Sequence, residues 1–304
     1  TLITSSAASD VYKRQHKMSA VNTLSHRELE PEKGVLYVVG TPIGNLNDLS
    51  FRAINILKNV SLIACEDTRQ TTKIMNKYEI KNQLISFNKD NSFNKIPLLI
   101  EKLKSDKSIA LVSDAGMPGI CDPGEDLIKN SKSSGIDIIC IPGPCAAITA
   151  LVSSGFPSST FIFEGFLPRQ KNEREKKIFN ISNNEKTTIL FESPYRLKKL
   201  LNDLMEFCGE DREIEVFREL TKKFEENVGN NLKKVINYFQ DKEIIGEITI
   251  VLKGVDKKKE SEFDNSFLKK ELHELVNAGL SLSSASKYLA KKNNIPKNNI
   301  YNLY

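Results

Sequence analysis

The sequence predicts a two-domain α/β protein whose first domain is built on a parallel sheet. Three observations support this prediction. The 304 residues match roughly two domains of ordinary size. Short β-branched strands alternate with amphipathic stretches from Gly34 onward, and Gly and Pro concentrate directly after the first, fourth and fifth strands. Ligands bind at the carboxyl ends of parallel strands, so these three loops predict the site.

The predicted first domain, 34–155, consists of five successive strand–helix units, a pattern typical of a parallel sheet covered on both faces. Its strands are expected over 34–40, 60–66, 83–87, 108–114 and 136–143. Its helices are expected over 50–59, 68–78, 94–104, 124–133 and 145–154.

The predicted second domain, 156–254, begins after a candidate hinge, SGFPSST. Strands and helices alternate less strictly there, which indicates a mixed sheet. Strands are expected over 160–166, 187–194, 213–220 and 246–254, and helices near 171–181, 195–208 and 230–240.

The two ends of the chain differ in composition from these domains. Residues 1–33 have no apolar periodicity and no signal-peptide core, and we interpret 1–17 as upstream or foreign sequence before a start at Met18. Residues 255–264 are predicted to be a charged linker. Residues 265–304 are predicted to form a helix-turn-helix-like module, whose continuation beyond Tyr304 is left open. Its expected core is Phe267, Leu268, Leu272, Leu275, Leu282 and Leu289.

Composition excludes several classes of function. The formal charge of +5 permits a nucleic-acid partner without requiring one. No run approaches the roughly 20 apolar residues of a membrane span. The chain has three histidines, with none between residues 27 and 272, which argues against Ser-His-Asp, Cys-His and most zinc chemistry in the core. Five cysteines without a CxxC pair indicate reduced thiols, a cytoplasmic protein and no metal site.

Glu66, Asp67 and Arg69 lie at the carboxyl end of the second strand and form the candidate catalytic group. Two carboxylates and a guanidinium at a sheet edge can tune a general base, because like charges raise a carboxyl pKa and a cation lowers it. A purely structural alternative remains for Asp67 or Thr68, either of which could cap the following helix.

The Gly- and Pro-rich loops do not match the usual phosphate-binding patterns. Gly40-Thr-Pro-Ile-Gly44 is not a GxGxxG sequence and lacks the GK[ST] ending of a P-loop. The loops over 113–124 and 141–147 are stiff and suited to presenting backbone groups to a ligand. Within the former, we interpret Asp122-Pro123-Gly124 as the start of the next helix, with Pro in its first turn.

Taken together, the strings GTPIGNLxDLSxRA, AxEDTRxT, LVSDAGxPxIxDPG, PGPxAxxxAL, FxFEGFLPR and FESPxR resemble the tetrapyrrole methylase superfamily. More narrowly, they resemble its bacterial small-subunit ribosomal RNA methyltransferase I group. The resemblance covers about Gly34 to Tyr304. It implies a homodimer that binds S-adenosylmethionine between two domains and methylates the ribose 2′-hydroxyl of a cytidine in the decoding region of 16S rRNA in the 30S subunit.

The resemblance also implies the cofactor-binding residues. They are Pro42, Ile43, Ala115, Gly116, Met117, Ile120, Pro144, Cys145, Ala146 and, from the second domain, Phe166. Many relatives outside the group carry Asp at the position of Met117, so backbone groups must serve there. The group is expected to carry a histidine after the third strand, where this chain has Asn88 and Lys89. Glu66 or Asp67 is then the candidate base or hydroxyl orienter, with Arg69 fixing the carboxylates or holding phosphate.

Candidate RNA-binding residues lie in two basic stretches, one after FEGFLP and one in the terminal module. They are Arg169, Lys171, Arg174, Lys176, Lys177, Lys291 and Lys292, with Lys287 and Lys297 as further candidates. Interleaved Glu173 and Glu175 allow the alternative of a solvated helix face. Two alternative functions remain open: a methylase of this fold acting on a tetrapyrrole or a protein side chain, and a ribosome-associated protein without catalysis.

Overall fold

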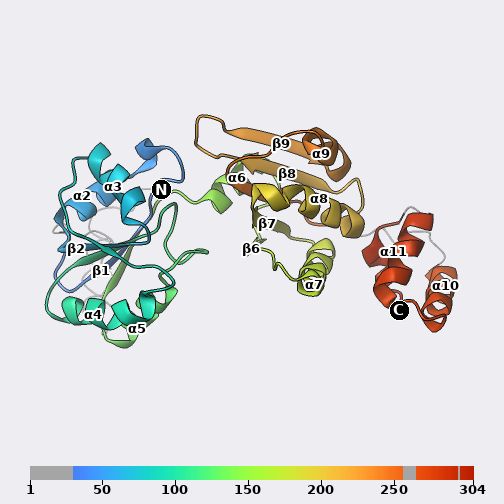
Figure 1. Ribbon diagram of the computed structural model, residues 1–304, viewed down its shortest axis with the longest axis horizontal. Helices are drawn as coiled ribbons and strands as arrows, with labels where there is room; N and C mark the ends of the chain where they lie inside the picture. The colour runs from blue at the N-terminus through green and yellow to red at the C-terminus, as the bar shows by residue number, and fades with distance from the viewer. Residues whose placement is uncertain (1–29, 256–264, 294) are drawn as a thin grey trace, which may run out of the picture.

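The computed structural model describes residues 30–255, 265–293 and 295–304. Within them, two five-stranded sheets are followed by a small helical module (Figure 1). The proposed lead-in up to residue 29 and the charged linker over 256–264 lie outside the described residues. Two of the residues 30–33, which we assigned to the lead-in, contact the first domain. Glu30 pairs with Arg52 of the first helix at 2.6 Å, and Glu32 donates its N–H to the hydroxyl of Tyr37 in the first strand at 2.8 Å.

The first sheet is parallel throughout, as predicted. Its strand order is β3-β2-β4-β1-β5. The strands are β1 (Leu36–Val39), β2 (Leu62–Cys65), β3 (Leu84–Ser86), β4 (Ile109–Val112) and β5 (Ile138–Ile141). Strands β1, β2 and β4 are buried along their whole length, which explains why they read as continuous apolar runs.

Four helices cover the two faces of this sheet (Figure 1). One face packs against α2 (Phe51–Asn59) and α3 (Thr68–Lys77), which contribute Ile56 and Ile74 to its core. The other packs against α4 (Ser92–Lys104) and α5 (Glu125–Ser133), which contribute Leu99 and Leu127. A short 3₁₀ helix, η1 (Leu46–Asp48), follows β1. Helix α5 begins at Glu125, one residue from the predicted start, with Gly124 as its N-cap. Pro123 therefore precedes the helix and does not lie in its first turn, contrary to our prediction.

The second sheet is mixed, as predicted, with the order β6-β7-β10-β8-β9. Its strands are β6 (Phe161–Phe166), β7 (Thr187–Glu192), β8 (Glu213–Arg218), β9 (Glu226–Asn231) and β10 (Ile248–Leu252). Only the β6–β7 pairing is parallel. Strand β9 was not predicted, because ENVGNN has one apolar residue and is typical of a loop; its pairing with β8 makes it a strand.

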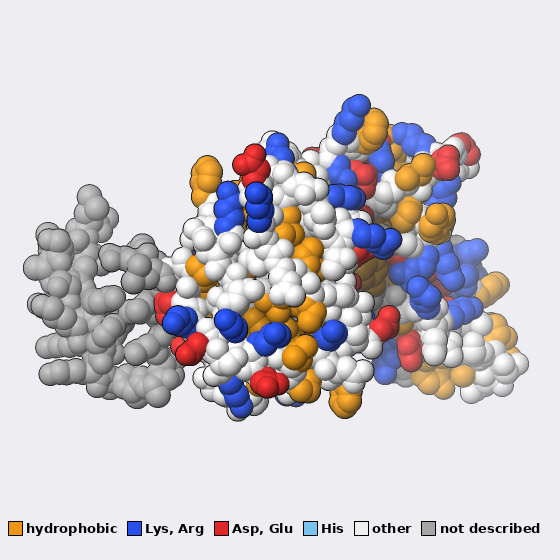
Figure 2. Space-filling view, turned by 60° about the vertical axis from the view of Figure 1, so that its left-hand side comes forward, with side chains coloured by type: hydrophobic (Ala, Val, Ile, Leu, Met, Phe, Trp, Pro, Cys, Tyr) orange, Lys and Arg blue, Asp and Glu red, His pale blue; other side chains and the backbone are white. Residues whose placement is uncertain are grey.

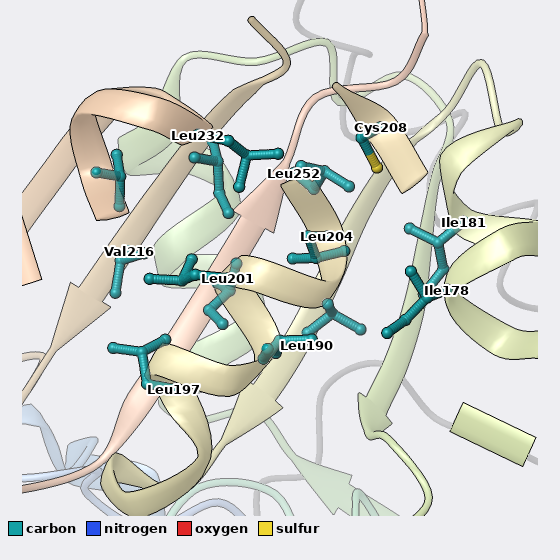
Figure 3. Packing of buried hydrophobic residues seen from close by; sticks show 14 of the residues in the cluster. Ile178, Ile181, Leu190, Leu197, Leu201, Leu204, Cys208, Val216, Leu232 and Leu252 are labelled. Carbon is teal, nitrogen blue, oxygen red and sulfur yellow. The ribbon is translucent and has the colours of Figure 1, made fainter. Parts of the chain in front are cut away.

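Helices α7 (Lys171–Ser182), α8 (Pro194–Cys208) and α9 (Leu232–Phe239) contribute to the core on one face of the mixed sheet. Figure 3 shows Leu197, Leu201 and Leu204 of α8 directed at the strands. The other face is covered by α6 (Ala146–Ser154), whose Ala150 and Leu151 are buried in a cluster with strand residues Ile189 and Val251. The last helix that we assigned to the first domain therefore packs on the second sheet, which joins the two halves.

The terminal module contains α10 (Asn265–Asn277), α11 (Leu282–Asn293) and α12 (Lys297–Tyr301). Leu268, Leu272 and Leu289 are buried in its own core as expected. Phe267 is 61% exposed, contrary to our prediction. In the described parts of the chain, no helix is long and apolar enough to cross a bilayer.

Candidate functional site

A cavity of about 400 Å³ lies between the two sheets, at the carboxyl ends of the parallel strands. The loops after β1, β4 and β5 form one wall, and the ends of β6 and β7 with the segment entering β10 form the other. The lining residues are Ile43, Ala115, Gly116, Met117, Ile120, Cys121, Asp122, Cys145, Ala146, Phe166, Phe191, Glu192, Ser193, Pro194, Gly246, Glu247, Ile248 and Thr249.

The loops of the first wall are locked together by backbone contacts. Thr41 and Gly116 exchange hydrogen bonds of 2.9 and 3.1 Å, and the Thr41 hydroxyl donates to the Ser113 carbonyl at 3.1 Å. A Cβ on Gly143 would stand 2.8 Å from the Gly40 Cα, so only two glycines allow these loops to approach. The binding wall is therefore preformed.

Eight of the ten predicted cofactor residues line the cavity: Ile43, Ala115, Gly116, Met117, Ile120, Cys145, Ala146 and Phe166. Pro42 and Pro144 flank this wall without lining the cavity, and Pro42 is buried. Phe166 is 54% exposed and packs edge-on against Phe191, with ring centroids 5.7 Å apart.

The second wall contains residues that the sequence analysis missed. Glu192 at the end of β7 is 2% exposed and pairs with Arg196 at 2.6 Å and Arg174 at 3.4 Å. Glu247 precedes β10 and accepts from Lys222 at 2.9 Å. The FESP string at 191–194, which we used only for the resemblance, could have indicated Glu192 as a site residue. The polar segment before β10 has no comparable signal, because only the folded sheet brings Glu247 to the cavity.

The candidate catalytic trio lies beside the cavity, and none of its members lines it. Asp67 is the N-cap of α3, accepting from the Arg69 N–H at 2.8 Å, as the structural alternative predicted. Its carboxylate also binds the Arg69 guanidinium, at 2.6 Å from Nη2. The hydrogen bonds from Arg69 lower the pKa of Asp67. Asp67 and Arg69 therefore neutralise each other and shape the loop.

Three other carboxyl groups near this edge have raised pKa values. Burial is the largest cause of the raised pKa for each of Glu66, Asp114 and Asp122, and repulsion from neighbouring carboxylates adds to it. Asp114 accepts the N–H of Asp67 at 3.0 Å, which ties the β2–α3 loop to the β4–α5 loop. The positive charge of Lys89 opposes the rise at Glu66 and Asp122. This edge is therefore a polar rim next to an apolar cavity.

Most of the candidate RNA-binding residues are exposed: Arg169, Lys171, Lys176, Lys177, Lys291 and Lys292. Lys and Arg side chains are prominent on the face in Figure 2, with acidic ones among them. Arg174 corrects our prediction, because it is 3% exposed and bound to Asp203 at 2.8 Å and to Glu192. A side chain held in this way inside the fold is not available to a nucleic acid.

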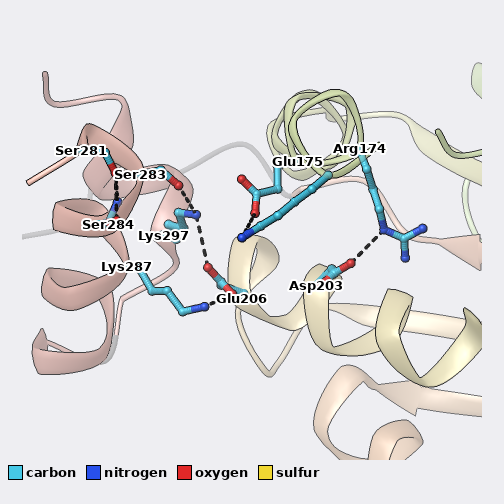
Figure 4. A network of polar contacts seen from close by, with 10 residues as sticks. Arg174, Glu175, Asp203, Glu206, Ser281, Ser283, Ser284, Lys287 and Lys297 are labelled. Carbon is cyan, nitrogen blue, oxygen red and sulfur yellow. Dashed lines mark hydrogen bonds and ion pairs between the residues drawn. The ribbon is translucent and has the colours of Figure 1, made fainter. Parts of the chain in front are cut away.

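Lys297 is also unavailable to RNA. It is 2% exposed and binds Glu206 of α8 at 3.2 Å. Lys287 reaches the same carboxylate at 2.9 Å (Figure 4). These two lysines attach the terminal module to the mixed-sheet half. All five cysteines are free thiols, and the described residues contain no group of three potential ligands that could hold a metal ion.

The parallel sheet, the mixed sheet and the loop-lined cavity between them define a methylase of the tetrapyrrole type. A sequence model of the family described as Tetrapyrrole (Corrin/Porphyrin) Methylases matches residues 35–236. The ribosomal RNA small subunit methyltransferase I of Bacillus subtilis is 41% identical over 277 residues, covering 90% of this chain and 94% of the relative. Its namesake from Thermotoga maritima is 46% identical over 221 residues, covering 73% and 99%. The chain belongs to this ribosomal RNA small subunit methyltransferase I family of tetrapyrrole methylases.

Solved structures support the fold. A uroporphyrin-III C-methyltransferase from Thermus thermophilus superimposes with a TM-score of 0.52 at 16% identity, covering 73% of this chain and 94% of the other. A cobalt precorrin-4 methyltransferase does so with a TM-score of 0.56 at 16% identity, covering 72% and 95%. At this identity the likeness concerns the architecture of the two sheets only.

Proposed function

We propose that the chain transfers a methyl group from S-adenosylmethionine to the ribose 2′-hydroxyl of a cytidine in the decoding region of 16S rRNA. The observation that carries the proposal is the cavity between the sheets, whose first wall consists of the Gly-, Ala-, Met- and Ile-containing loops after three parallel strands. Its relatives' names supply the rRNA substrate. The cytidine and the 2′-hydroxyl rest on the resemblance of the sequence motifs.

The cavity suits S-adenosylmethionine in shape and charge. That cofactor has an adenine, an amino-acid tail and a sulfonium cation, and it needs apolar walls with backbone hydrogen-bonding groups. The lining contains three carboxylates, Asp122, Glu192 and Glu247, and no Lys or Arg. A pyrophosphate-bearing cofactor would require the opposite charge.

When bound, S-adenosylmethionine supplies a methyl group on a good leaving group, so the reaction depends mainly on in-line positioning of the hydroxyl. Ile43, Met117, Ile120 and Ala146 would hold the adenosyl part and exclude water. At Met117 only the backbone can donate or accept strongly. Glu66 on the polar rim is the member of the trio that forms no ion pair with a described residue, so it would orient an incoming ribose, while Asp67 and Arg69 hold its loop in place.

The RNA would approach over basic side chains of α7 and the terminal module. Arg169, Lys176 and Lys291 are exposed and form no ion pair with another described residue. Phosphate contacts of this kind position a nucleic acid without reading its sequence. We further propose that the chain acts as a homodimer on the 30S subunit in the cytoplasm, without a metal.

Purified chain, labelled S-adenosylmethionine and 30S subunits lacking the mark test this proposal. We expect one alkali-resistant 2′-O-methylcytidine in 16S rRNA. Transfer to a corrinoid or a protein side chain, with no transfer to RNA, would contradict it. Calorimetry separates a remaining alternative: intact cofactor affinity with no turnover on any of these acceptors would indicate a ribosome-associated binder.

A further inference from the structure

One carboxylate of the cavity differs from the other two. Glu192 is neutralised by Arg174 and Arg196, and Glu247 is paired with Lys222. Asp122 forms no ion pair with any residue that the structure describes; its carboxylate accepts a hydrogen bond from Ser113. A half-buried carboxylate in a binding cavity that has no ion-pair partner in direct contact is available for chemistry.

The backbone holds Asp122 firmly in this position. The loop between β4 and α5 has positive φ at Gly119 (+83°), Cys121 (+66°) and Gly124 (+148°). Positive φ is strained for Cys121, by about 1–3 kcal/mol in general, and such strain persists only where the surroundings impose it. The Cys121 thiol lies 3.0 Å from the point where a Cβ on Gly165 would stand, so this loop is packed against β6 of the other half.

Asp122 also stands at the boundary between the two parts of the site. It follows Ile120 and Cys121 in the cavity wall, and it is close enough to interact electrostatically with Glu66 and Lys89 on the rim. An acceptor hydroxyl must enter between the apolar cofactor walls and this rim. We propose that Asp122 is a catalytic residue that accepts the proton of the attacking hydroxyl, with Lys89 as a positioning residue that keeps Asp122 ionised; this inference rests on the function proposed above.

The proposed methyl transfer is a simple displacement at the methyl carbon. A lone pair of the ribose O2′ forms the new bond to the methyl carbon, the bond from that carbon to sulfur breaks, and its electron pair neutralises the sulfonium. The O2′ proton passes to a carboxylate oxygen of Asp122, which later returns it to water. Such a base contributes about 10²- to 10⁴-fold in rate.

The electrostatic environment of Asp122 predicts the direction in which turnover changes with pH. Burial raises the pKa of Asp122, and the charges of Asp114 and Glu247 raise it further, whereas the Ser113 hydrogen bond and Lys89 lower it. Glu66 faces it from the neighbouring loop. A base works only when ionised, so turnover should fall as the pH drops through this raised pKa. Without Lys89 the fall should begin at a higher pH.

The first experiment compares Asp122→Asn with the wild-type chain in single turnovers on 30S subunits at saturating cofactor. We expect a rate reduction of at least about 100-fold, with the cofactor Kd from calorimetry changed by less than about threefold. Asp126→Asn, the same change at an exposed position of α5, should leave both values unchanged. An active Asp122→Asn variant, or a loss explained entirely by weaker cofactor binding, would overturn the proposal. So would a Glu66→Gln variant that alone carries the rate loss.

The second experiment needs neither cofactor nor RNA. Carbon-13 NMR of labelled carboxyl groups, assigned with Asp122→Asn, should give Asp122 a pKa above that of an ordinary Asp. Lys89→Met should raise the pKa further, and Lys89→Arg should restore it. Lys89 is exposed, so these variants should fold. The inference would be refuted if Asp122 had an ordinary pKa that did not change in the Lys89 variants, whatever the result with RNA.

The two proposals fail in different ways. If the wild-type chain leaves 30S subunits unmethylated, the rRNA function is contradicted. If the wild-type chain and the Asp122→Asn variant methylate them at equal rates, only the role of Asp122 is contradicted. In the first case the NMR titration still decides whether Asp122 has the electrostatic environment proposed here.

Discussion

Asn45 donates its backbone N–H to the Oγ1 atom of Thr221 at 3.1 Å, across the junction between the parallel and the mixed sheet. Thr221 and Glu219 both have positive φ, +66° and +54°, an uncommon conformation for residues other than Gly. Glu219 binds Lys222, which also binds Glu247 in the cavity wall. A strained turn of one half is therefore fixed to the first Gly-rich loop of the other. Because Glu247, the end of this chain of contacts, lines the cavity, we expect the junction to affect cofactor binding.

Gly44→Ala should widen this junction. A Cβ on Gly44 would stand 2.4 Å from Cγ of Lys222, 2.8 Å from Oγ1 of Thr221 and 3.0 Å from the carbonyl oxygen of Leu220. Overpacking of this kind costs about 1–3 kcal/mol. We expect at least about tenfold weaker binding of S-adenosylmethionine in calorimetry, because tenfold corresponds to about 1.4 kcal/mol.

Thr221→Ser is the matched control, since it keeps the hydroxyl that accepts from Asn45 and should bind the cofactor like the wild type. Equal affinity in Gly44→Ala would show that the cavity does not depend on this junction.

Lys297→Met should loosen the terminal module. The Lys297 ammonium lies 4.2 Å from the Phe207 ring centroid and 3.2 Å from Glu206, so Met keeps the apolar contact and removes the charge. Glu206 retains Lys287 as a partner, and we expect a loss of about 1–2 kcal/mol of docking free energy, below the value for a completely broken buried pair. Hydrogen exchange should accelerate in α11 and α12 but not in β1 or β4.

Lys292→Met provides the comparison, because Lys292 pairs with Glu271 inside the module at an exposed position. If both variants exchange equally fast, the buried lysine has no special part in docking.

The same contact predicts a dependence on pH. Burial opposes ionisation of Glu206, but the hydrogen bond from Lys287 and the charge of Lys297 outweigh it, and the pKa of Glu206 falls below its ordinary 4.5. A lowered pKa stabilises the docked state above pH 4.5, and this contribution disappears as the pH falls through the lower folded value. The ring centroid of Tyr301 lies 5.0 Å from that of Phe179, so the ring signals of Tyr301 should report undocking in NMR only below pH 4.5. Signals that change instead near neutral pH would contradict this assignment.

Neutralising Arg169 and Lys176 should weaken binding to 30S subunits. Each exposed cation that contacts a phosphate releases counterions, so the double alanine variant should reduce the salt slope of log K by about 1–2. The cofactor affinity should not change, because neither residue lines the cavity. Filter binding between 50 and 200 mM salt, a range of the usual order, measures the slope; an unchanged slope would place the RNA elsewhere.

Arg174→Met tests whether a buried cation of α7 differs in its role from an exposed cation of the same helix. Its loss leaves Glu192 and Asp203 with fewer partners, so we expect a lower melting temperature, with a destabilisation of about 3 kcal/mol, and an unchanged salt slope for the folded fraction.

The fold was predictable because it follows from local patterns. The strands of the parallel sheet are short apolar runs separated by amphipathic helices. This alternation of apolar and amphipathic segments can be recognised without knowledge of distant residues. Strand β9 was not predictable in this way, because Val228 is its single apolar side chain and its partner β8 is what defines it. The packing of α6 on the second sheet was not predictable for the same reason. An amphipathic pattern indicates that one face of a helix is buried, but it does not indicate against which sheet.

The site was predictable on the side where one loop provides several residues. Ala115, Gly116, Met117 and Ile120 are neighbours in sequence and in the cavity. Charged groups were harder to place. Arg174 reads as one cation in a basic helix, and only the positions of Glu192 and Asp203 on β7 and α8 make it an interior residue. Asp122 was similarly read as the start of a helix, because its distance from Glu66 and Lys89 is set by the register of the sheet.

Gly143→Ala should be more damaging than Gly44→Ala, because the surrounding atoms cannot move aside. The new Cβ would stand 2.8 Å from Cα and C and 2.9 Å from O of Gly40, all of them backbone atoms at the end of β1. The loops after β1 and β5 must then separate, and with them Ile43 and Cys145 on the cofactor wall. We expect cofactor binding to fall by more than about 100-fold, or about 2.7 kcal/mol, together with a lower melting temperature. Gly135→Ala is the control, since its Cβ meets nothing within 4 Å and its φ of +71° costs only local strain, about 1–2 kcal/mol. Equal cofactor affinity in the two variants would mean that the contact between Gly40 and Gly143 does not shape the cavity.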